Sequence, residues 1–459
     1  MINFYNTLTR TKEEFKPIQT GKVGIYSCGP TVYSSPHIGN MYAYVSWDIL
    51  TRTLRYLGFE VNQVMNITDV GHLTSDADSG EDKMEKGSKR EGLSVWEVAK
   101  KYESEFMESL EMLNIVKPSI FCRATDHIKE QIELIEKLEK NGFTYKISDG
   151  IYFDTSKFPG YGDFARLNLD KIKEGARVEE NQEKINPSDF ALWKFSPLGI
   201  KRQMEWESPW GMGFPGWHIE CTAMSTKYLG ETFDIHTGGE DHIPVHHTNE
   251  IAQGYGAFGH QTANYWIHNA FITIGIDKMS KSKGEVYTIR QLKEKGFDPI
   301  VYRYMSINSH YKGGMAFSLE GLETARLSYE KLLLSVSKWK ETGGGGKVDE
   351  SYKTEFGEVI SNDLAMPEAM AVVWKLVKSD LTDSDKLATI LDFDRVLGLR
   401  LDREVVEDKI PEEVTKMAEE RQKLKDEKRW AEADEIRDKI LEIGFVVEDN
   451  KNGYKIRKV

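Results

Sequence analysis

Short apolar runs and one longer amphipathic segment alternate in the first part of the chain. Residues 23–28 form a β-rich run that ends at Gly29-Pro30, and residues 38–57 carry apolar side chains at helical spacing. Residues 61–67 form a second run, rich in β-branched side chains. This order of strand, helix and strand predicts a parallel sheet, and such sheets bind ligands at the carboxyl ends of their strands.

The middle of the chain interrupts this pattern. Residues 75–92 mix acidic, basic and glycine residues without apolar periodicity, which predicts a solvated loop or insertion. Helical spacing follows at 95–113 and 128–141, and strand-like pieces lie within 144–153. We therefore expect a subdomain to be inserted into the sheet and to end near residue 209.

The sheet pattern then resumes and gives way to helices. Helical spacing occurs at 216–229 and 244–255, on either side of a strand-like run at 233–236. Beyond residue 317 the pattern predicts long helices, at 319–340, 351–360, 367–377, 387–397 and 411–441. A short β-like tail follows. The expected fold class is α/β, with a Rossmann-like parallel-sheet domain, an inserted subdomain, an all-α helical bundle and a small mixed α/β domain at the C-terminus.

Size and composition agree with several globular domains. The chain has 459 residues, more than one hydrophobic core usually organises, and 39% of them are hydrophobic. The net charge of −13 argues against a general nucleic-acid coat protein, because phosphate contacts favour a basic surface, but it allows a local basic groove. No apolar run is long enough to cross a bilayer, and the first ten residues resemble neither a signal nor a transit peptide. The expected location is cytoplasmic.

Two polar motifs suit the binding of a triphosphate. Pro36-His37-Ile38-Gly39-Asn40 begins the first predicted helix, and helix N-termini attract anions. Lys278-Met279-Ser280-Lys281-Ser282 places two lysines on a loop flanked by serines. A solvated charge cluster is the alternative for these lysines, but it explains neither the serines nor the spacing.

Thiol, imidazole and carboxylate groups suggest a metal site. The three cysteines are too few and too scattered for a disulfide framework, so we expect reduced thiols, and Cys122 is interpreted as structural. His246 and Glu250 lie four residues apart in a helical pattern and therefore share one face. Cys28 and Cys221 could complete a zinc set, although a lone cysteine is more often a small buried apolar side chain. His247 is the closest competitor of His246 as a ligand.

Several short motifs occur in one order along the chain. They are Cys28-Gly29-Pro30-Thr31-Val32-Tyr33, His37-Ile38-Gly39-Asn40, Asn66-Ile67-Thr68-Asp69, Gly216-Trp217-His218-Ile219-Glu220-Cys221, Asp234-Ile235-His236, His246-His247-Thr248-Asn249-Glu250 and the lysine loop. In this order they resemble the motifs of cysteinyl-tRNA synthetases. Leu391-Asp392-Phe393-Asp394 and residues 431–437 extend the resemblance to the C-terminal part. The resemblance implies a class I synthetase that uses ATP to join L-cysteine to its tRNA through a cysteinyl-adenylate.

The resemblance also implies which residues hold the metal and the substrates. One Zn²⁺ would be bound by Cys28, Cys221, His246 and Glu250, and Mg²⁺ would accompany ATP. Because zinc lowers the pKa of a thiol and binds the thiolate, cysteine would be held by its own sulfur and serine rejected without a separate editing site. Cysteine would be contacted by Gly29, Thr68, Trp217 and His236. ATP would be contacted by His37, Gly39, Asn40, Gly238, Gly239, Asp241, Lys278, Ser280 and Lys281.

Four of these residues would act in catalysis, by donating hydrogen bonds to phosphate or neutralising the charge of leaving pyrophosphate: His37, Asn40, Lys278 and Lys281. Two alternatives remain open from the sequence. Trp217 could be a core aromatic residue, and Gly238-Gly239 an ordinary turn.

Some positions depart from the family pattern. Asn40 stands where a second histidine is usual; it can donate a hydrogen bond but cannot carry a positive charge, and we expect activity to survive. Thr248 replaces a commoner acidic residue, and residues 283–285 differ from the usual continuation of the lysine loop. In the tail, where the family often has a tryptophan, Tyr454 is the candidate for stacking on an anticodon base.

The expected organisation follows from the motifs. The boundaries are 1–120 and 210–275 for the two halves of the catalytic domain, 121–209 for the inserted subdomain, 276–318 for the lysine-loop junction, 319–402 for the helical bundle and 403–459 for the anticodon-contacting domain. We expect a monomer that binds L-cysteine, ATP and the tRNA for cysteine, and no membrane. The alternatives are a ligase that joins cysteine to a small amine, as in mycothiol synthesis, and a non-catalytic nucleotide- or RNA-binding relative. The first needs no anticodon-binding module, and the second needs no complete metal set.

Overall fold

Two compact units make up the chain. The computed structural model describes residues 1–71, 82–167, 182–197, 199, 202–274, 277–278, 286–342, 344–404, 411–450 and 453–458. One unit comprises residues 1–293 and 297–401, and the other comprises 294–296 and 402–459. Each is described by itself below. Among the described helices, none is both long and apolar enough to cross a bilayer.

A five-stranded parallel sheet forms the centre of the larger unit, in the order β11-β10-β3-β4-β5. Its strands are β3 (Lys22–Ser27), β4 (Glu60–Ile67), β5 (Ile120–Arg123), β10 (Phe233–Gly239) and β11 (Ala263–Asn269). The order confirms the predicted strand, helix and strand start of the chain, since β3 and β4 pair in parallel and helix α1 (Ile38–Tyr56) connects them. All carboxyl ends of these strands meet at one edge.

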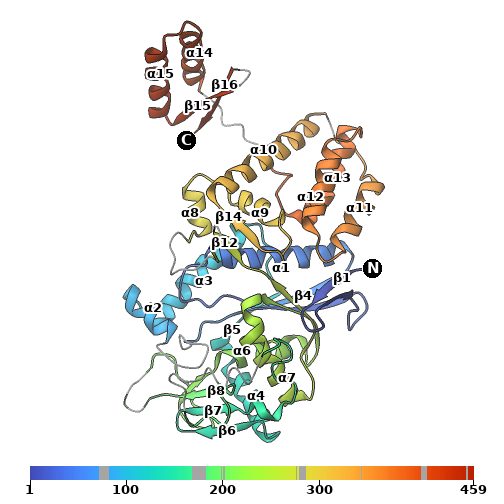
Figure 1. Cartoon of the computed structure of the whole chain (residues 1–459), viewed down its shortest axis with the longest axis vertical. Coiled ribbons are helices and arrows are strands. Elements are labelled where there is room, and N and C mark those ends of the chain that lie inside the picture. The colour runs from blue at the N-terminus through green and yellow to red at the C-terminus, as the bar shows by residue number, and fades with distance from the viewer. Residues whose placement is uncertain are drawn as a thin grey trace. The chain divides into compact units, whose positions relative to one another are not determined.

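Helices cover both faces of this sheet, because alternate side chains of each strand point to opposite sides. On one face, Val23 and Ile25 of β3 pack with Leu50 and Leu54 of α1. On the other face, strand residues such as Tyr26 and Val64 join a second core with three helices: α4 (Ile128–Lys140), α6 (Trp217–Leu229) and α7 (Thr248–Phe258). Figure 1 shows α1 on one side of the sheet and α4, α6 and α7 on the other.

An antiparallel sheet interrupts the parallel one, and its first two strands coincide with the strand-like pieces expected within 144–153. Its order is β6-β7-β8-β9, and its strands are β6 (Thr144–Ile147), β7 (Gly150–Phe153), β8 (Phe190–Phe195) and β9 (Gly213–Pro215). β9 leads directly into α6, so the insertion returns the chain to the carboxyl edge of the parallel sheet.

Helices and short strands complete the larger unit. The helices are α3 (Val95–Met112), α8 (Ile289–Glu294), α9 (Pro299–Ile307), α10 (Leu319–Glu341), α11 (Glu350–Ile360), α12 (Met366–Val377) and α13 (Asp383–Leu397). The short strands are β1 (Asn3–Asn6), β2 (Thr11–Glu14), β12 (Ile272–Ile274), β13 (Asp277–Lys278) and β14 (Met315–Phe317). Arg303 of α9, fully buried, pairs with Asp48 of α1 at 2.6 Å and donates to the carbonyl of Leu397, which fixes α1 against α9 and α13.

Two expectations about helices were wrong. Within the predicted loop 75–92, helix α2 (Lys83–Glu91) forms; Asp82 caps its N-terminus and Gly92, at φ 68°, ends it. The cause is that capping, rather than an apolar stripe, defines this very polar helix. The predicted single helix 411–441 is two helices, α14 (Glu412–Asp426) and α15 (Trp430–Glu442), because the chain turns at Lys428, whose φ is 62°.

The smaller unit has its own core. α14 and α15 pack against a hairpin of β15 (Phe445–Asn450) and β16 (Gly453–Lys458), which confirms the β-like tail. The buried residues that hold it together are Val414, Ala418, Leu424, Ala433, Ile436, Ile440, Phe445 and Val447.

Candidate active site

Four potential metal ligands meet at the carboxyl edge of the parallel sheet. Cys28 follows β3 directly, Cys221 lies in the second turn of α6, His246 lies in a π-helical turn (Ile243–His247), and Glu250 lies in the first turn of α7. One ligand atom from each lies within 4.8 Å of the others, and all four residues are buried. Two thiols, one imidazole and one carboxylate therefore face one another, a donor set that zinc accepts.

Histidines hold both oxygens of the Glu250 carboxylate. His246 Nε2 lies 3.0 Å from Oε1, and His236 Nε2 lies 2.9 Å from Oε2. His218 Nδ1 lies 2.9 Å from Nδ1 of His246. The carboxylate and the His246 ring are thus oriented by neighbours before any ligand arrives.

His247 also reaches the cluster, as the competition with His246 anticipates. A second group of potential ligands, overlapping the first, comprises Cys28, His236, His247 and Glu250. Both ring nitrogens of His247 have partners, as those of His246 do: Nε2 lies 3.3 Å from Cys28 Sγ and Nδ1 lies 2.7 Å from Nε2 of His268. His268 Nδ1 in turn lies 2.8 Å from the hydroxyl oxygen of Thr7.

The buried hydrogen bonds that link Cys28, His247, His268 and Thr7 have one consistent donor–acceptor order when Cys28 is a thiolate. The thiolate can only accept, so His247 donates from Nε2 and accepts at Nδ1; His268 then donates from Nε2 and accepts from the Thr7 hydroxyl. Burial lowers the pKa of both His247 and His268, which favours the neutral rings that the series requires. In this arrangement His247 is a hydrogen-bond donor to the Cys28 sulfur.

The residues of this cluster shift one another's pKa values. Burial opposes the charged form of His246, but Glu250 and Cys221 outweigh it and raise its pKa to about 10. Burial also opposes ionisation of Cys221, yet the hydrogen bond with Cys28 and the charge of His246 lower its pKa to about 7. Burial raises the pKa of Cys28 far above its usual range. His246 and Cys28 would therefore each have to give up a proton in order to bind a metal.

A cavity of about 350 Å³ opens beside the cluster. Eight of the residues expected to contact metal, cysteine or ATP line it: Cys28, Gly29, His37, Gly39, Asn40, Trp217, Gly239 and Asp241. Three others are not among its lining residues. His236 is fully buried and stacks on Trp266, Thr68 is 1% exposed, and Gly238 packs against His247 and His242.

The lysine loop falls largely outside the described residues. Ser280 and Lys281 are among those not described, as are residues 283–285, where the family pattern differs. Lys278 ends strand β13, where it pairs with Thr273 of β12.

Trp217 is a wall of the cavity rather than a core residue. Its ring is half-buried and stacks on the ring of His246 with centroids 4.5 Å apart and an interplanar angle of 28°. It begins helix α6, on which Cys221 lies one turn later. The aromatic wall and one of the metal ligands are therefore positioned by the same helix.

The loop after β3 is fitted closely to the end of β4. Asn66 Oδ1 accepts from the amide of Gly29 at 2.7 Å, and Asn66 Nδ2 donates to the Thr68 hydroxyl at 3.0 Å. That hydroxyl donates to Glu220 Oε2 at 3.0 Å. A side chain on Gly29 would overlap the carbonyl oxygen of Asn66, so only glycine fits there.

His37 and Asn40 form the N-terminal cap of α1. His37 Nδ1 accepts from the Asn40 amide, and Asn40 Oδ1 accepts from the His37 amide, both at 3.2 Å. This reciprocal capping box explains how asparagine is accommodated where the family usually has histidine. Both residues line the cavity, with His37 half-buried and Asn40 exposed, beside a helix N-terminus that favours anions.

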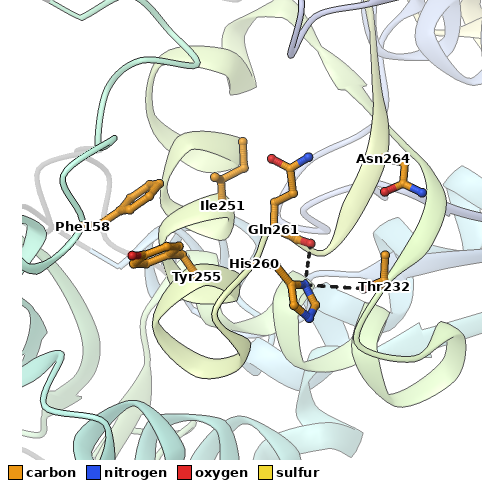
Figure 2. Close-up of a pocket in the computed structure, with 7 residues that line it drawn as sticks. All are labelled: Phe158, Thr232, Ile251, Tyr255, His260, Gln261 and Asn264. Atoms are coloured by element: carbon orange, nitrogen blue, oxygen red, sulfur yellow. Dashed lines mark hydrogen bonds between the residues drawn. The ribbon is translucent and has the colours of Figure 1, made fainter.

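A second cavity, of about 460 Å³, lies at the opposite edge of the parallel sheet. Figure 2 shows its lining: the stacked rings of Phe158 and Tyr255 on one side, and His260, Gln261 and Asn264 near the start of β11 on the other. None of the residues predicted from the sequence lies in it.

The sequence interpretation missed several residues of the site. They are Thr7, Lys83, His218 and His268. Thr7 and His268 are separated by 261 residues, so no local pattern could connect them. His218 and Lys83 could have been noted, since His218 lies within one of the quoted motifs and Lys83 lies within the predicted loop at 75–92.

Comparisons with known proteins agree with this geometry. Residues 14–327 match the tRNA synthetases class I (C) catalytic domain, and residues 407–457 match the cysteinyl-tRNA ligase anticodon binding domain. The chain is 49% identical to "Cysteine--tRNA ligase 1" of Burkholderia lata, over 99% of this chain and 96% of that protein. It is 44% identical to "Cysteine--tRNA ligase" of Treponema denticola, over 98% of each.

A solved structure supports the fold. Mycobacterium tuberculosis methionyl-tRNA synthetase in complex with methionyl-adenylate superposes with a TM-score of 0.55 at 15% identity, covering 83% of this chain and 90% of that one. The likeness confirms the class I synthetase fold expected from the sequence. Together with the family matches over both units, it shows that the chain belongs to the cysteinyl-tRNA synthetase family.

Proposed function

We propose that this protein joins L-cysteine to the tRNA for cysteine at the expense of ATP, through a cysteinyl-adenylate. The observation that carries the proposal is the buried group of Cys28, Cys221, His246 and Glu250, of which Cys28 lines a cavity that also contains the N-terminus of α1. A thiol-rich metal group suits recognition of sulfur, and a helix N-terminus suits recognition of phosphate. The two substrates of adenylate formation would therefore share one cavity.

Zinc would be held by Cys28, Cys221, His246 and Glu250. When bound, it would take the substrate's thiolate as a ligand, which serine cannot supply at neutral pH. The chain's own residues would do the rest of the recognition. His247 would donate a hydrogen bond to the Cys28 sulfur, and His236 would hold Oε2 of Glu250. Trp217 would form one side of the cysteine subsite.

The adenylation step would rest on positioning and charge. A carboxylate oxygen of cysteine attacks the α-phosphorus of ATP, and pyrophosphate leaves. His37 and Asn40 would donate hydrogen bonds to the phosphates beside the N-terminus of α1. Gly239, the last residue of β10, and Asp241, in the turn that follows, would contact the ribose. Lys278 and Lys281 would neutralise the leaving pyrophosphate. Mg²⁺ would accompany ATP.

The smaller unit would contact the anticodon. Its match to the cysteinyl-tRNA ligase anticodon binding domain supports this role. Trp430, at the start of α15, is 58% exposed and offers a ring on which an unpaired base could stack. It is a stronger candidate than Tyr454, which packs against the core of the hairpin unit.

Neither alternative function is favoured. A ligase acting on a small amine would have no use for an anticodon-binding unit, and the matches cover both units of the chain. We further propose a monomer in the cytoplasm, where the three free cysteines would stay reduced.

Two assays test the proposed function. Cysteine-dependent exchange of pyrophosphate into ATP reports adenylate formation, and transfer of labelled cysteine to tRNA reports charging. Both are expected from zinc-loaded protein. Exchange without charging would support a small-molecule ligase, and absence of exchange would overturn both enzyme functions.

A further inference from the structure

A lysine outside every family motif named above lies in the active-site cavity. Lys83, the first residue of α2, lines the cavity together with His37, Asn40 and Trp217. Its Nζ lies 5.4 Å from the centroid of the Trp217 ring and 6.0 Å from that of Tyr33. Among the described residues that line this cavity, it is the only lysine or arginine.

The start of α2 is fixed by a buried ion pair. Asp82 caps the helix by accepting from the amides of Met84 at 2.7 Å and Glu85 at 3.0 Å, and its carboxylate also pairs with Arg202. The guanidinium of Arg202 lies 3.7 Å above the ring of Phe214, in β9. Because β9 runs directly into Trp217, one network positions both Lys83 and the aromatic wall that it faces.

Adenylate formation creates a need for a cation at this place. Two anions, the carboxylate of cysteine and the α-phosphate of ATP, must approach within bonding distance. The subsites proposed for them lie at Trp217 and at the N-terminus of α1, and Lys83 lines the cavity with both. A preorganised cation that faces the reacting centre lowers the barrier most, because it needs no reorganisation during the step.

We propose that Lys83 is a further catalytic residue, whose ammonium contacts the reacting carboxylate and the α-phosphate oxygens. This inference rests on the proposed function. In the step, a carboxylate oxygen forms a bond to the α-phosphorus, the bond from that phosphorus to the bridging oxygen breaks, and pyrophosphate carries away the electron pair. Lys83 keeps its protons throughout and acts only through charge and hydrogen bonds.

A structural role predicts a different result. If Lys83 served only to hold the Trp217 ring by a cation–π contact, its loss would loosen the cysteine subsite and raise the KM for cysteine. A group that contacts the transition state lowers kcat instead. The two roles are therefore separated by steady-state kinetics.

The experiment compares Lys83→Met and Lys83→Arg with Lys86→Met, a matched control because Lys86 is exposed on the same helix. Zinc-loaded variants with the parent's metal content and melting temperature are assayed by cysteine-dependent pyrophosphate exchange. Lys83→Met is expected to lower kcat about 100-fold, as does removal of other donors to developing charge. Lys83→Arg should recover about tenfold of that loss, and Lys86→Met should stay within about twofold of the parent.

The proposal is overturned if the kcat of Lys83→Met stays within about threefold of the parent, or if only the KM for cysteine changes. It is also overturned if Lys83→Arg is no better than Lys83→Met. Should Lys83→Met fail to fold, Lys83→Ala is assayed with added methylammonium, and saturable recovery is expected; a folded Lys83→Ala without recovery counts against the proposal. A parent protein without exchange would instead refute the proposed function.

Discussion

Substitution of Gly29 by alanine tests how closely the loop after β3 must fit the end of β4. The new Cβ would overlap the carbonyl oxygen of Asn66 and lie 2.7 Å from its carbonyl carbon and 3.2 Å from Met65 Cγ. Contacts of a real Cβ are not shorter than 3.0 Å. The obstacle is backbone rather than a flexible side chain, so the loop itself has to move.

That movement has two measurable costs. Overpacking of this kind destabilises by about 1–3 kcal/mol, and the upper end is expected because the carbonyl belongs to a buried strand end. The displaced loop carries Cys28 and leads to His37, and a misplacement of about 1 Å costs about 100-fold in rate. Gly29→Ala should therefore lower both the free energy of unfolding and cysteine-dependent pyrophosphate exchange.

Gly357→Ala is the matched control. Gly357 lies inside helix α11, and no atom within 4 Å would meet its Cβ. This variant should gain about 0.5–1 kcal/mol, because alanine is the better helix former. Urea unfolding, followed by tryptophan fluorescence, measures the stability of both variants. If Gly29→Ala unfolds at the same urea concentration as the parent and exchanges at the parental rate, the described fit of the loop is wrong.

Two further predictions concern the donors around the metal group and the smaller unit. His268→Leu removes the donor to His247 Nδ1 and should weaken zinc binding about tenfold, measured by competition with a chromophoric chelator. His268→Gln keeps an N–H and should lose less affinity for zinc. Equal zinc affinity in both variants and the parent would contradict the hydrogen-bond series from Thr7 through His268 and His247 to Cys28. Trp430→Ala should lower the rate of tRNA charging about tenfold by removing a stacking surface, while cysteine-dependent pyrophosphate exchange stays unchanged. A charging rate equal to that of the parent, or a parallel loss of pyrophosphate exchange, would count against base stacking by this exposed ring.

Periodicity predicted the elements that have an apolar stripe. The run at 23–28, the helix at 38–57 and the run at 61–67 all appear in the structure within one or two residues of the expected bounds. Their spacing reflects burial on a defined face, and burial leaves a direct trace in the sequence. The elements that were wrong, α2 and the break between α14 and α15, depend on caps and one residue at positive φ, which leave a much weaker trace.

The site was predictable to the extent that its residues are local or belong to a motif. Spacing predicted that His246 and Glu250 share a helix face, ligand chemistry suggested Cys28 and Cys221 beside them, and the resemblance implied the same four residues. The hydrogen bonds that orient them could not be predicted, because Thr7 after β1, His247 in the π-helical turn and His268 in β11 come together only in the folded chain. Side-chain contacts across such separations depend on tertiary packing rather than on any local pattern.

Selection of cysteine over serine tests the central claim most directly. Zinc-loaded protein is assayed by pyrophosphate exchange with each amino acid, and Cys221→Ser and Glu250→Ala are assayed beside it after their zinc content has been measured. The account predicts strong preference for cysteine in the parent, loss of zinc and of that preference in Cys221→Ser, and a milder loss of metal in Glu250→Ala. Parental zinc content and undiminished preference for cysteine in Cys221→Ser would contradict recognition of the substrate through its sulfur.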